Sequence, residues 1–103
     1  MTVEEIRAIV VAVDPGARHY VSNREGDAFT VWQEYRLLDF SADDEHQEGW
    51  AFEIDYYTKQ DMDPKARALM EALEAHAGVS YTYQVVYEAD TGYIRHIFDC
   101  EGY

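Results

Sequence analysis

The sequence has a single cysteine, Cys100, among its 103 residues. A lone cysteine cannot close a disulfide within the chain, and it excludes a zinc site made from several cysteines of one chain. The sequence also lacks any apolar run near the roughly 20 residues that a membrane-spanning helix needs, and its first residues lack the features of a signal peptide. We therefore expect a protein that is made and kept in a reducing cytosol, without membrane contact.

Basic residues are also scarce, because 8 Lys and Arg stand against 21 Asp and Glu and give a formal net charge of −13. Affinity for nucleic acid or anionic lipid comes largely from neutralising phosphates, so this charge excludes tight nonspecific binding to nucleic acid. The acidity then has several interpretations. It can simply keep the protein in solution, it can repel nucleic acid, or it can imitate nucleic acid and so occupy a basic partner.

Apolar residues, in contrast, are plentiful, since hydrophobic residues make up 48% of the chain and aromatic residues 15%. This is enough material for a packed core, and the length suits one domain rather than two. We expect a single domain that spans residues 1–103.

The segment from Gly49 to Lys59 predicts the central strand of a sheet, because its side chains alternate between apolar and polar. One face of this strand carries residues that need a core: Trp50, Phe52, Ile54 and Tyr56. The other face carries Glu53, Asp55, Tyr57 and Lys59. We expect the first face to hold the helices and the second to face a lumen or a partner, so that replacing both carboxylates with Ala changes stability by less than about 1 kcal/mol.

Two segments predict amphipathic helices. The first runs from Val3 to about Val13, after a capping box that begins at Thr2. The second runs from about Pro64 to Ala77, with Asp63 as its N-cap and Gly78 as its C-terminal stop.

The remaining strands are predicted as two hairpins. Arg18–Asn23 and Ala28–Arg36 form the first, and Val79–Tyr87 and Tyr93–Phe98 form the second. Between the first hairpin and the central strand, residues 37–48 are dense in acid and have no apolar period, which predicts a long acidic loop or an extended arm.

The predicted fold class is therefore α+β, in the order α-β-β-β-α-β-β, with a mainly antiparallel sheet and two helices packed on one face. The other face then stays open, with tyrosines and carboxylates on it. Tyrosine is favoured at protein interfaces, so we interpret this composition as a contact surface for another protein chain. The tyrosines that suggest it are Tyr56, Tyr57, Tyr81, Tyr83, Tyr87 and Tyr93.

The sequence gives little support for catalysis or for a bound cofactor. Glu53 and Asp55 lie about 7 Å apart on one strand face, a spacing seen in glycoside hydrolases. However, the chain has no phosphate-binding loop, no nucleophile elbow and no Cys/His pair. The acids Asp43, Asp44, Glu45 and Glu48 lack the pattern of an EF-hand, so we expect no metal site, no cofactor and no enzyme activity.

Three stretches carry a family resemblance: Phe40-Ser41-Ala42-Asp43-Asp44-Glu45, then Phe52-Glu53-Ile54-Asp55-Tyr56-Tyr57-Thr58-Lys59, then Tyr87-Glu88-Ala89-Asp90-Thr91-Gly92-Tyr93 with His96. In this order and spacing the chain resembles the tail terminator proteins, also called tail completion or head–tail joining proteins, of tailed phages and prophages of Gram-positive bacteria. The resemblance covers roughly Trp32 to the C-terminus.

This resemblance implies a structural protein without catalysis that forms a ring, typically a hexamer, at the head-proximal end of a long non-contractile tail. Its partners would be copies of itself, the major tail protein and the connector or head-completion protein. It would occur in the bacterial host cytoplasm and in the assembled virion. The acidic segment 43–48 would reach a neighbouring subunit or a tail subunit.

From the residues and the resemblance together we expect an assembly interface at Asp43, Asp44, Glu45, Glu53, Asp55, Tyr57, Tyr87 and Asp90. The alternative function is an acidic inhibitor that mimics DNA and blocks a nucleic-acid-binding protein of the host. Oligomeric state distinguishes the two, because the terminator assembles and the inhibitor does not need to.

Overall fold

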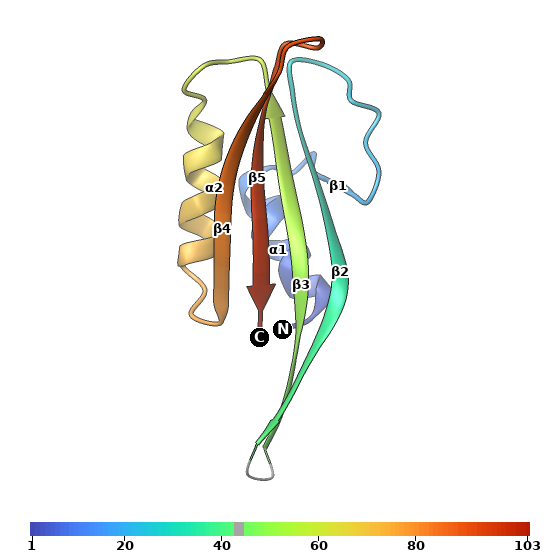
Figure 1. The fold of residues 1–103 in the computed structure, drawn as a ribbon, viewed down its shortest axis with the longest axis vertical. Coiled ribbons are helices and arrows are strands. Elements are labelled where there is room, and N and C mark those ends of the chain that lie inside the picture. Colours follow the sequence, from blue (N-terminus) through green and yellow to red (C-terminus); the bar gives the residue numbers. More distant parts are fainter. Residues whose placement is uncertain (43–44) are drawn as a thin grey trace.

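The computed structural model describes residues 1–42 and 45–103 as one sheet with two helices on one of its faces (Figure 1). The five strands lie in the order β1-β2-β3-β5-β4. The elements are α1 (Val3–Val13), β1 (Arg18–His19), β2 (Ala28–Ala42), β3 (Glu45–Thr58), α2 (Pro64–Glu74), β4 (Val79–Glu88) and β5 (Tyr93–Gly102). The predicted α+β class, the order of the elements and the mainly antiparallel pairing are confirmed.

The first helix follows its sequence signals closely. The Thr2 hydroxyl accepts a hydrogen bond from the Glu5 N–H at 3.1 Å, and the Glu5 carboxylate accepts one from the Thr2 N–H at 3.3 Å. These bonds satisfy N–H groups that the first turn of a helix leaves unpaired, which explains why α1 begins at Val3.

The second helix begins as predicted, with Asp63 as its N-cap, but ends at Glu74. Gly78 is not its C-terminal stop, so that prediction is wrong. A Cβ atom at Gly78 would lie 2.6 Å from the carbonyl oxygen of Tyr103, so this glycine is required by the close approach of the chain's last residue. Sequence alone does not distinguish a glycine needed for a cap from one needed for such an approach.

The core lies between the helices and one face of β3, where Phe52, Ile54 and Tyr56 are buried and Trp50 packs partly against them. The predicted assignment of the two faces of this strand is confirmed. The other buried members of the core come from both helices and the neighbouring strands: Ile6, Ile9, Val10, Trp32, Ala66, Leu69, Leu73, Phe98 and Cys100.

The predicted first hairpin is wrong. β1 contains only Arg18 and His19, and it pairs with β2 in parallel rather than antiparallel. Tyr20, Arg24 and Gly26 adopt positive φ angles of 69°, 54° and 81°, which turn the chain into a wide connection over residues 20–27. The Tyr93 hydroxyl donates to the Gly26 carbonyl at 2.6 Å and thereby fixes this connection to the end of the sheet.

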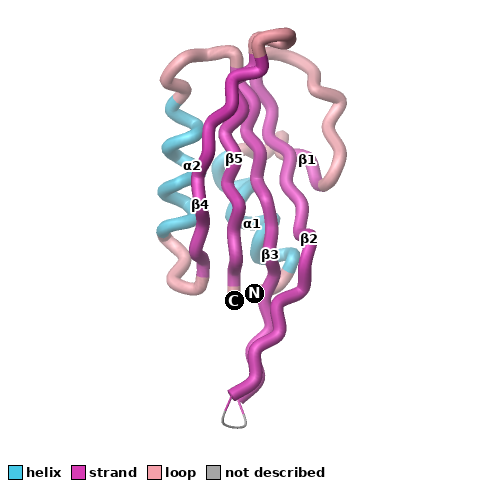
Figure 2. The backbone as a smooth tube through the Cα atoms, viewed as in Figure 1, coloured by secondary structure: helices cyan, strands magenta, loops and turns pink. Residues whose placement is uncertain are grey.

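Residues 37–48 are not a loop within the described part of the chain. β2 and β3 stay paired from the body out to Ala42 and Glu45, so the extended-arm interpretation is the correct one. We call the two strand segments Leu37–Ala42 and Glu45–Gly49 the arm; they project beyond the body and give the molecule extents of 51 × 23 × 23 Å (Figure 2). Asp43 and Asp44 lie outside the described residues.

Candidate functional site

The face of the sheet opposite the helices is covered by no described helix, and we call it the open face. Its members follow from the strand register, in which Phe29 opposes Tyr57, Val31 opposes Asp55, and Glu53 opposes Asp99. The side chains discussed below are Phe29, Tyr35, Arg36, Glu53, Asp55, Tyr57, Tyr93, Arg95, Asp99 and Glu101.

A charge pair lies near the middle of the open face. The Arg95 guanidinium donates to Asp55 Oδ2 at 3.0 Å and lies 4.0 Å from the Glu53 carboxylate. Asp55 is only 7% exposed. The Arg95 side chain is partly exposed, at 30%, and removal of Asp55 would leave its guanidinium without this close partner. The expectation that Glu53 and Asp55 can be replaced with little loss of stability stays a prediction, and this contact argues against it for Asp55.

This pair also holds two buried polar atoms, Asp55 Oδ1 and Arg95 Nε, that form no hydrogen bond with any described residue. Burial and the neighbouring charge of Asp55 raise the pKa of Glu53 to about 7. Near neutral pH, Glu53 is therefore partly protonated, and its carboxylic O–H is a suitable donor for Asp55.

Toward the β4–β5 turn, aromatic rings and cations pack over the open face. Phe29 stacks on Tyr57 with ring centroids 4.6 Å apart, and Tyr93 meets both rings edge-on. The Arg24 guanidinium lies 4.8 Å from the Tyr57 ring, and the Lys59 ammonium lies 5.0 Å from the Tyr93 ring. Tyr57 is consequently only 9% exposed, because cation–π contacts within the monomer cover it.

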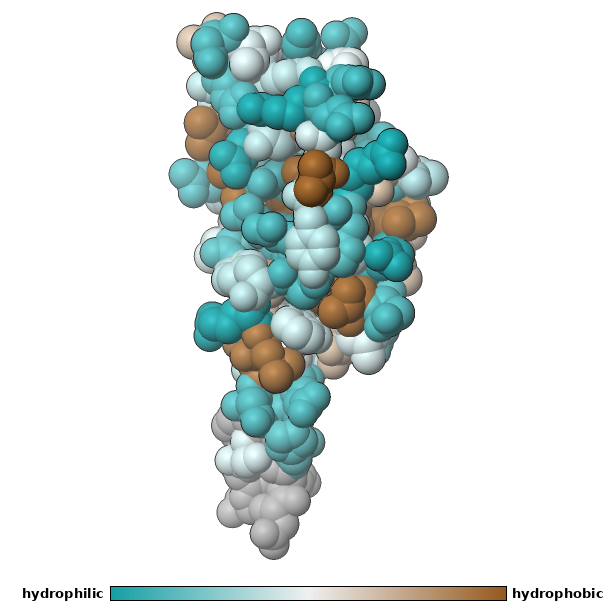
Figure 3. All heavy atoms as spheres, turned by 90° about the vertical axis from the view of Figure 1, so that its right-hand side faces the viewer, coloured by the Kyte–Doolittle hydropathy of each residue, from teal (hydrophilic) through white to brown (hydrophobic). Residues whose placement is uncertain are grey.

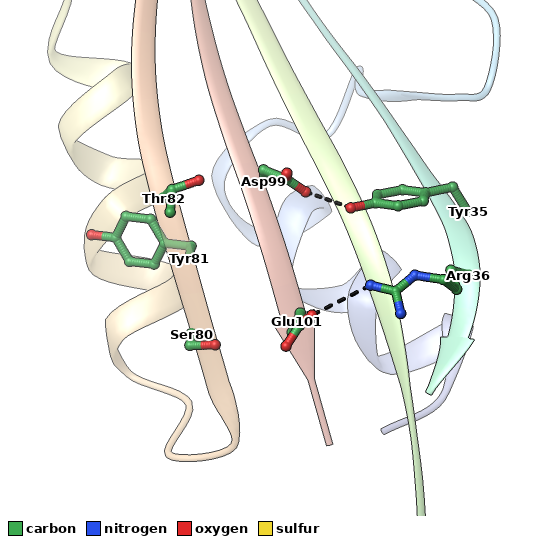
Figure 4. A pocket seen from close by; sticks show the side chains of 7 residues that line it. All are labelled: Tyr35, Arg36, Ser80, Tyr81, Thr82, Asp99 and Glu101. Carbon is green, nitrogen blue, oxygen red and sulfur yellow. Dashed lines mark hydrogen bonds and ion pairs between the residues drawn. The ribbon is translucent and has the colours of Figure 1, made fainter. Parts of the chain in front are cut away.

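Toward the arm, side chains from β2 and β5 bridge across β3. The Tyr35 hydroxyl donates to Asp99 at 2.6 Å, and Arg36 lies 3.5 Å from Glu101 (Figure 4). On β3, Ala51 lies between Arg36 and Glu101 and is fully buried, and Glu53 lies opposite Asp99. The bridging side chains border a hollow of about 360 Å³. The hydrogen bond to Asp99 raises the pKa of Tyr35 to about 12, so this hydroxyl stays a donor.

A β-bulge explains why sequence alternation missed this arrangement. The register of β2 against β3 shifts between Glu34 and Arg36. The extra residue brings Tyr35 and Arg36 onto the same face, although strict alternation assigns them to opposite faces. No local signal in the sequence marks the bulge.

The structure does not gather the expected interface residues into one surface. Glu53, Asp55 and Tyr57 share the open face, whereas Tyr87 is exposed on the helix side and Asp90 lies in the β4–β5 turn. Glu45 begins β3 in the arm. Whether these residues contact a partner stays a prediction.

The tyrosines are divided in the same way. Of the six tyrosines singled out in the sequence, Tyr57 and Tyr93 belong to the open face, and Tyr56, Tyr81, Tyr83 and Tyr87 lie on the helix side. Tyr56 donates to Asp63 at 2.6 Å, Tyr81 donates to Glu74 at 2.6 Å, and the Tyr83 hydroxyl lies 2.7 Å from His96 Nδ1. Several of these hydroxyl groups are therefore engaged within the monomer, and they do not form a single contact surface.

The described residues contain no cluster of three or more His, Cys, Asp or Glu side chains that could hold a metal ion. None of the helices in the described ranges has the length and apolar character needed to cross a membrane.

Comparison with known proteins gives a match in structure but none in sequence. No family model matches the chain, and no curated protein matches it. Its fold is shared with one chain of the virion of a native gene transfer agent (GTA) particle. That superposition has a TM-score of 0.62 and covers 96% of this chain and 87% of the other, at 12% sequence identity. At this identity the likeness establishes a common fold alone.

Proposed function

We propose that this chain is a structural protein of a virion and that it acts as a tail terminator. In this role, copies of the chain form a ring, typically a hexamer, at the head-proximal end of a phage or prophage tail, end the growth of the tail tube and join it to the head connector. The observation that carries the proposal is the fold shared with a gene transfer agent virion chain over 96% of this chain. Among virion proteins, we propose a tail terminator because of the three sequence stretches that resemble this family.

The shape and charge of the molecule agree with this role. A body with a projecting two-stranded arm can contact one neighbour through the body and another through the arm. A net charge of −13 suits a ring through which DNA passes without binding. The role requires no catalytic step, no cofactor and no membrane, and it places the protein in the host cytoplasm before assembly and in the virion afterwards.

The alternative, a DNA-mimic inhibitor, is supported by the net charge but less well by the arrangement of the acids. A mimic needs free carboxylates spaced like phosphates. On the open face Asp55 pairs with Arg95, Glu101 lies beside Arg36, and Asp99 accepts from Tyr35. These carboxylates are engaged within the monomer, so they do not form a free acidic array.

Tail assembly in solution tests the proposal. The purified protein is added to the major tail protein of the same phage or prophage while that protein polymerises, and the tubes are measured by electron microscopy. We expect shorter tubes that carry a ring at one end. An unrelated acidic protein at the same concentration controls for charge.

The result would contradict the proposal if tube length were unchanged and no ring were visible at any protein concentration. If the protein instead stayed monomeric and displaced DNA from a basic protein of the host, the result would support the inhibitor function in place of the terminator function. Rings can require high protein concentration, so light scattering is recorded over a concentration series.

A further inference from the structure

The outer edge of β4 is unusually open to pairing with another strand. β4 is a ten-residue edge strand, VSYTYQVVYE, without proline or glycine. Charged residues make up 28% of the chain, yet the only one in β4 is Glu88, its last residue. Soluble proteins usually protect an edge strand with charges, proline or a bulge, because its free N–H and C=O groups can pair with another chain. β4 has none of these along its length until Glu88.

The helix layer covers only the first part of this strand, where Val79 and Tyr81 pack against the core. Every residue from Thr82 to Tyr87 is exposed, including those on the helix side. Val85 is 49% exposed and Tyr87 is 65% exposed, although α2 lies beside β4 (Figure 1). An incoming strand would therefore find both the backbone groups and apolar side chains accessible.

The arm, in turn, lacks a third strand, which β4 of another copy could provide. Beyond the body it is a two-stranded ribbon, with neither β1 nor β5 beside it. Two-stranded ribbons are marginally stable in water, and a third strand gives them independent stability. The outer strand of the arm, Leu37–Ala42, spans about 20 Å and β4 about 33 Å at 3.3 Å per residue, so the whole segment fits along β4.

Charge does not oppose this pairing. The arm exposes Asp39 and Glu48, whereas β4 carries no acid before Glu88, so the two strands bring no like charges together over most of their length. The flank of the molecule on the β2 side shows only small, separated apolar patches (Figure 3), so a contact there depends on strand edges rather than on a broad apolar surface. The exposed side chain of Leu37 provides one apolar contact at the root of the arm.

We propose that subunits associate by strand addition, with β4 of one copy pairing with the outer edge of β2 in the arm of the next copy. β4 and the arm are different surfaces, so the contact is heterologous and continues from copy to copy until it closes into a ring. This inference rests on the proposed ring function and names the interface that builds the ring.

Thiol cross-linking tests the pairing. Two single variants are made, Val86→Cys in β4 and Ser41→Cys in the arm, and both positions are exposed. The variants are mixed at high concentration and treated with a short bismaleimide, which does not require knowledge of the exact register. We expect a cross-linked heterodimer on denaturing gels. The wild-type protein controls for the native Cys100, which is buried.

The controls separate this arrangement from a symmetric one. If Val86→Cys alone gives most of the cross-linked product, β4 pairs with β4 of another copy and the inference is overturned. Ala89→Cys, in the adjacent turn, serves as the matched position outside the edge. Equal cross-linking of Ala89→Cys and Val86→Cys with the arm variant would indicate random collision and would likewise overturn the inference.

A charge placed on the edge gives an independent test. Val86→Lys is expected to weaken self-association at least about tenfold as measured by light scattering. Val86 is 37% exposed and lies opposite Arg95, so the melting temperature is recorded as well, to separate a loss of association from a loss of monomer stability. Ala89→Lys adds the same charge in the turn and should have no such effect. If Val86→Lys forms rings as readily as the wild-type protein, the proposed pairing of β4 with the arm is wrong, while the proposed function stands. If the wild-type protein forms no oligomer, alone or on tail tubes, both fail.

Discussion

The two faces of β3 are buried by different means. On the helix side, Phe52, Ile54 and Tyr56 are covered by a second layer of secondary structure. On the open face, Asp55 and Tyr57 are covered only by side chains reaching from neighbouring segments, such as Arg95 and Arg24. The comparison shows that a sheet face without helices need not be solvent-exposed, since long cationic side chains can lie across it.

Truncation of a side chain should lower the free energy of unfolding more on the helix side than on the open face. Phe52 is fully buried in the core, so Phe52→Ala removes apolar contacts and leaves a cavity. We expect a loss of about 3–5 kcal/mol in the free energy of unfolding. Urea denaturation followed by tryptophan fluorescence measures it. A loss below about 1 kcal/mol would mean that Phe52 is not tightly packed in the core.

The second-largest loss of stability should come from the charge pair on the open face. Asp55→Ala leaves the Arg95 guanidinium without its 3.0 Å partner, and we expect a loss of about 2–4 kcal/mol. The double variant Asp55→Leu with Arg95→Met serves as the control, because replacing both charges with apolar groups should recover most of the loss. If Asp55→Ala alone is neutral, the pair does not stabilise the monomer.

The pH dependence of stability should report the proton on Glu53. Its pKa rises from an ordinary value of 4.5 to about 7 on folding, so the folded state binds more protons between these values. The free energy of unfolding should therefore fall as pH rises from about 4.5 to about 7, by roughly 1–2 kcal/mol for this partly exposed group. Denaturation midpoints at a series of pH values measure the change.

Glu53→Gln is the matched variant for this prediction, because the amide resembles the protonated carboxyl and can donate to Asp55. Its stability should lack the fall across this pH range and exceed that of the wild type at pH 8. Parallel pH profiles for the two proteins would show that Glu53 does not titrate in this way.

The smallest effect should come from the bridge nearest the arm. Arg36 and Glu101 are both exposed and lie 3.5 Å apart, so Arg36→Ala should cost no more than about 0.5 kcal/mol. Thermal melting compared with that of Glu101→Ala and the double variant gives the coupling between them. A coupling above about 1 kcal/mol would show that this bridge behaves like the buried pair around Asp55.

Sequence reasoning succeeded where the signals are local. The capping box at Thr2 and the alternation in β3 depend on residues close together in the chain, and both predicted the structure correctly.

Sequence reasoning failed where the structure depends on residues that are distant in the chain. The pairing of Asp55 with Arg95 follows from the register of β3 against β5, and neither residue has a signal in its own neighbourhood. The parallel β1 depends on a backbone reversal at Tyr20 and Arg24, residue types that rarely adopt positive φ. The arm was difficult to recognise because its described side chains beyond Leu38 and Gly49 are exposed, so no apolar alternation marks it.

The bulge at Tyr35 has a consequence for how such a chain can diverge. Glu34 opposes Phe52 and Arg36 opposes Ala51, so deletion of Tyr35 would restore regular alternation and leave the two faces of the outer arm strand unchanged. The loss would fall on the open face instead, because the hydroxyl group that bridges β3 to Asp99 would be gone while the arm kept its register.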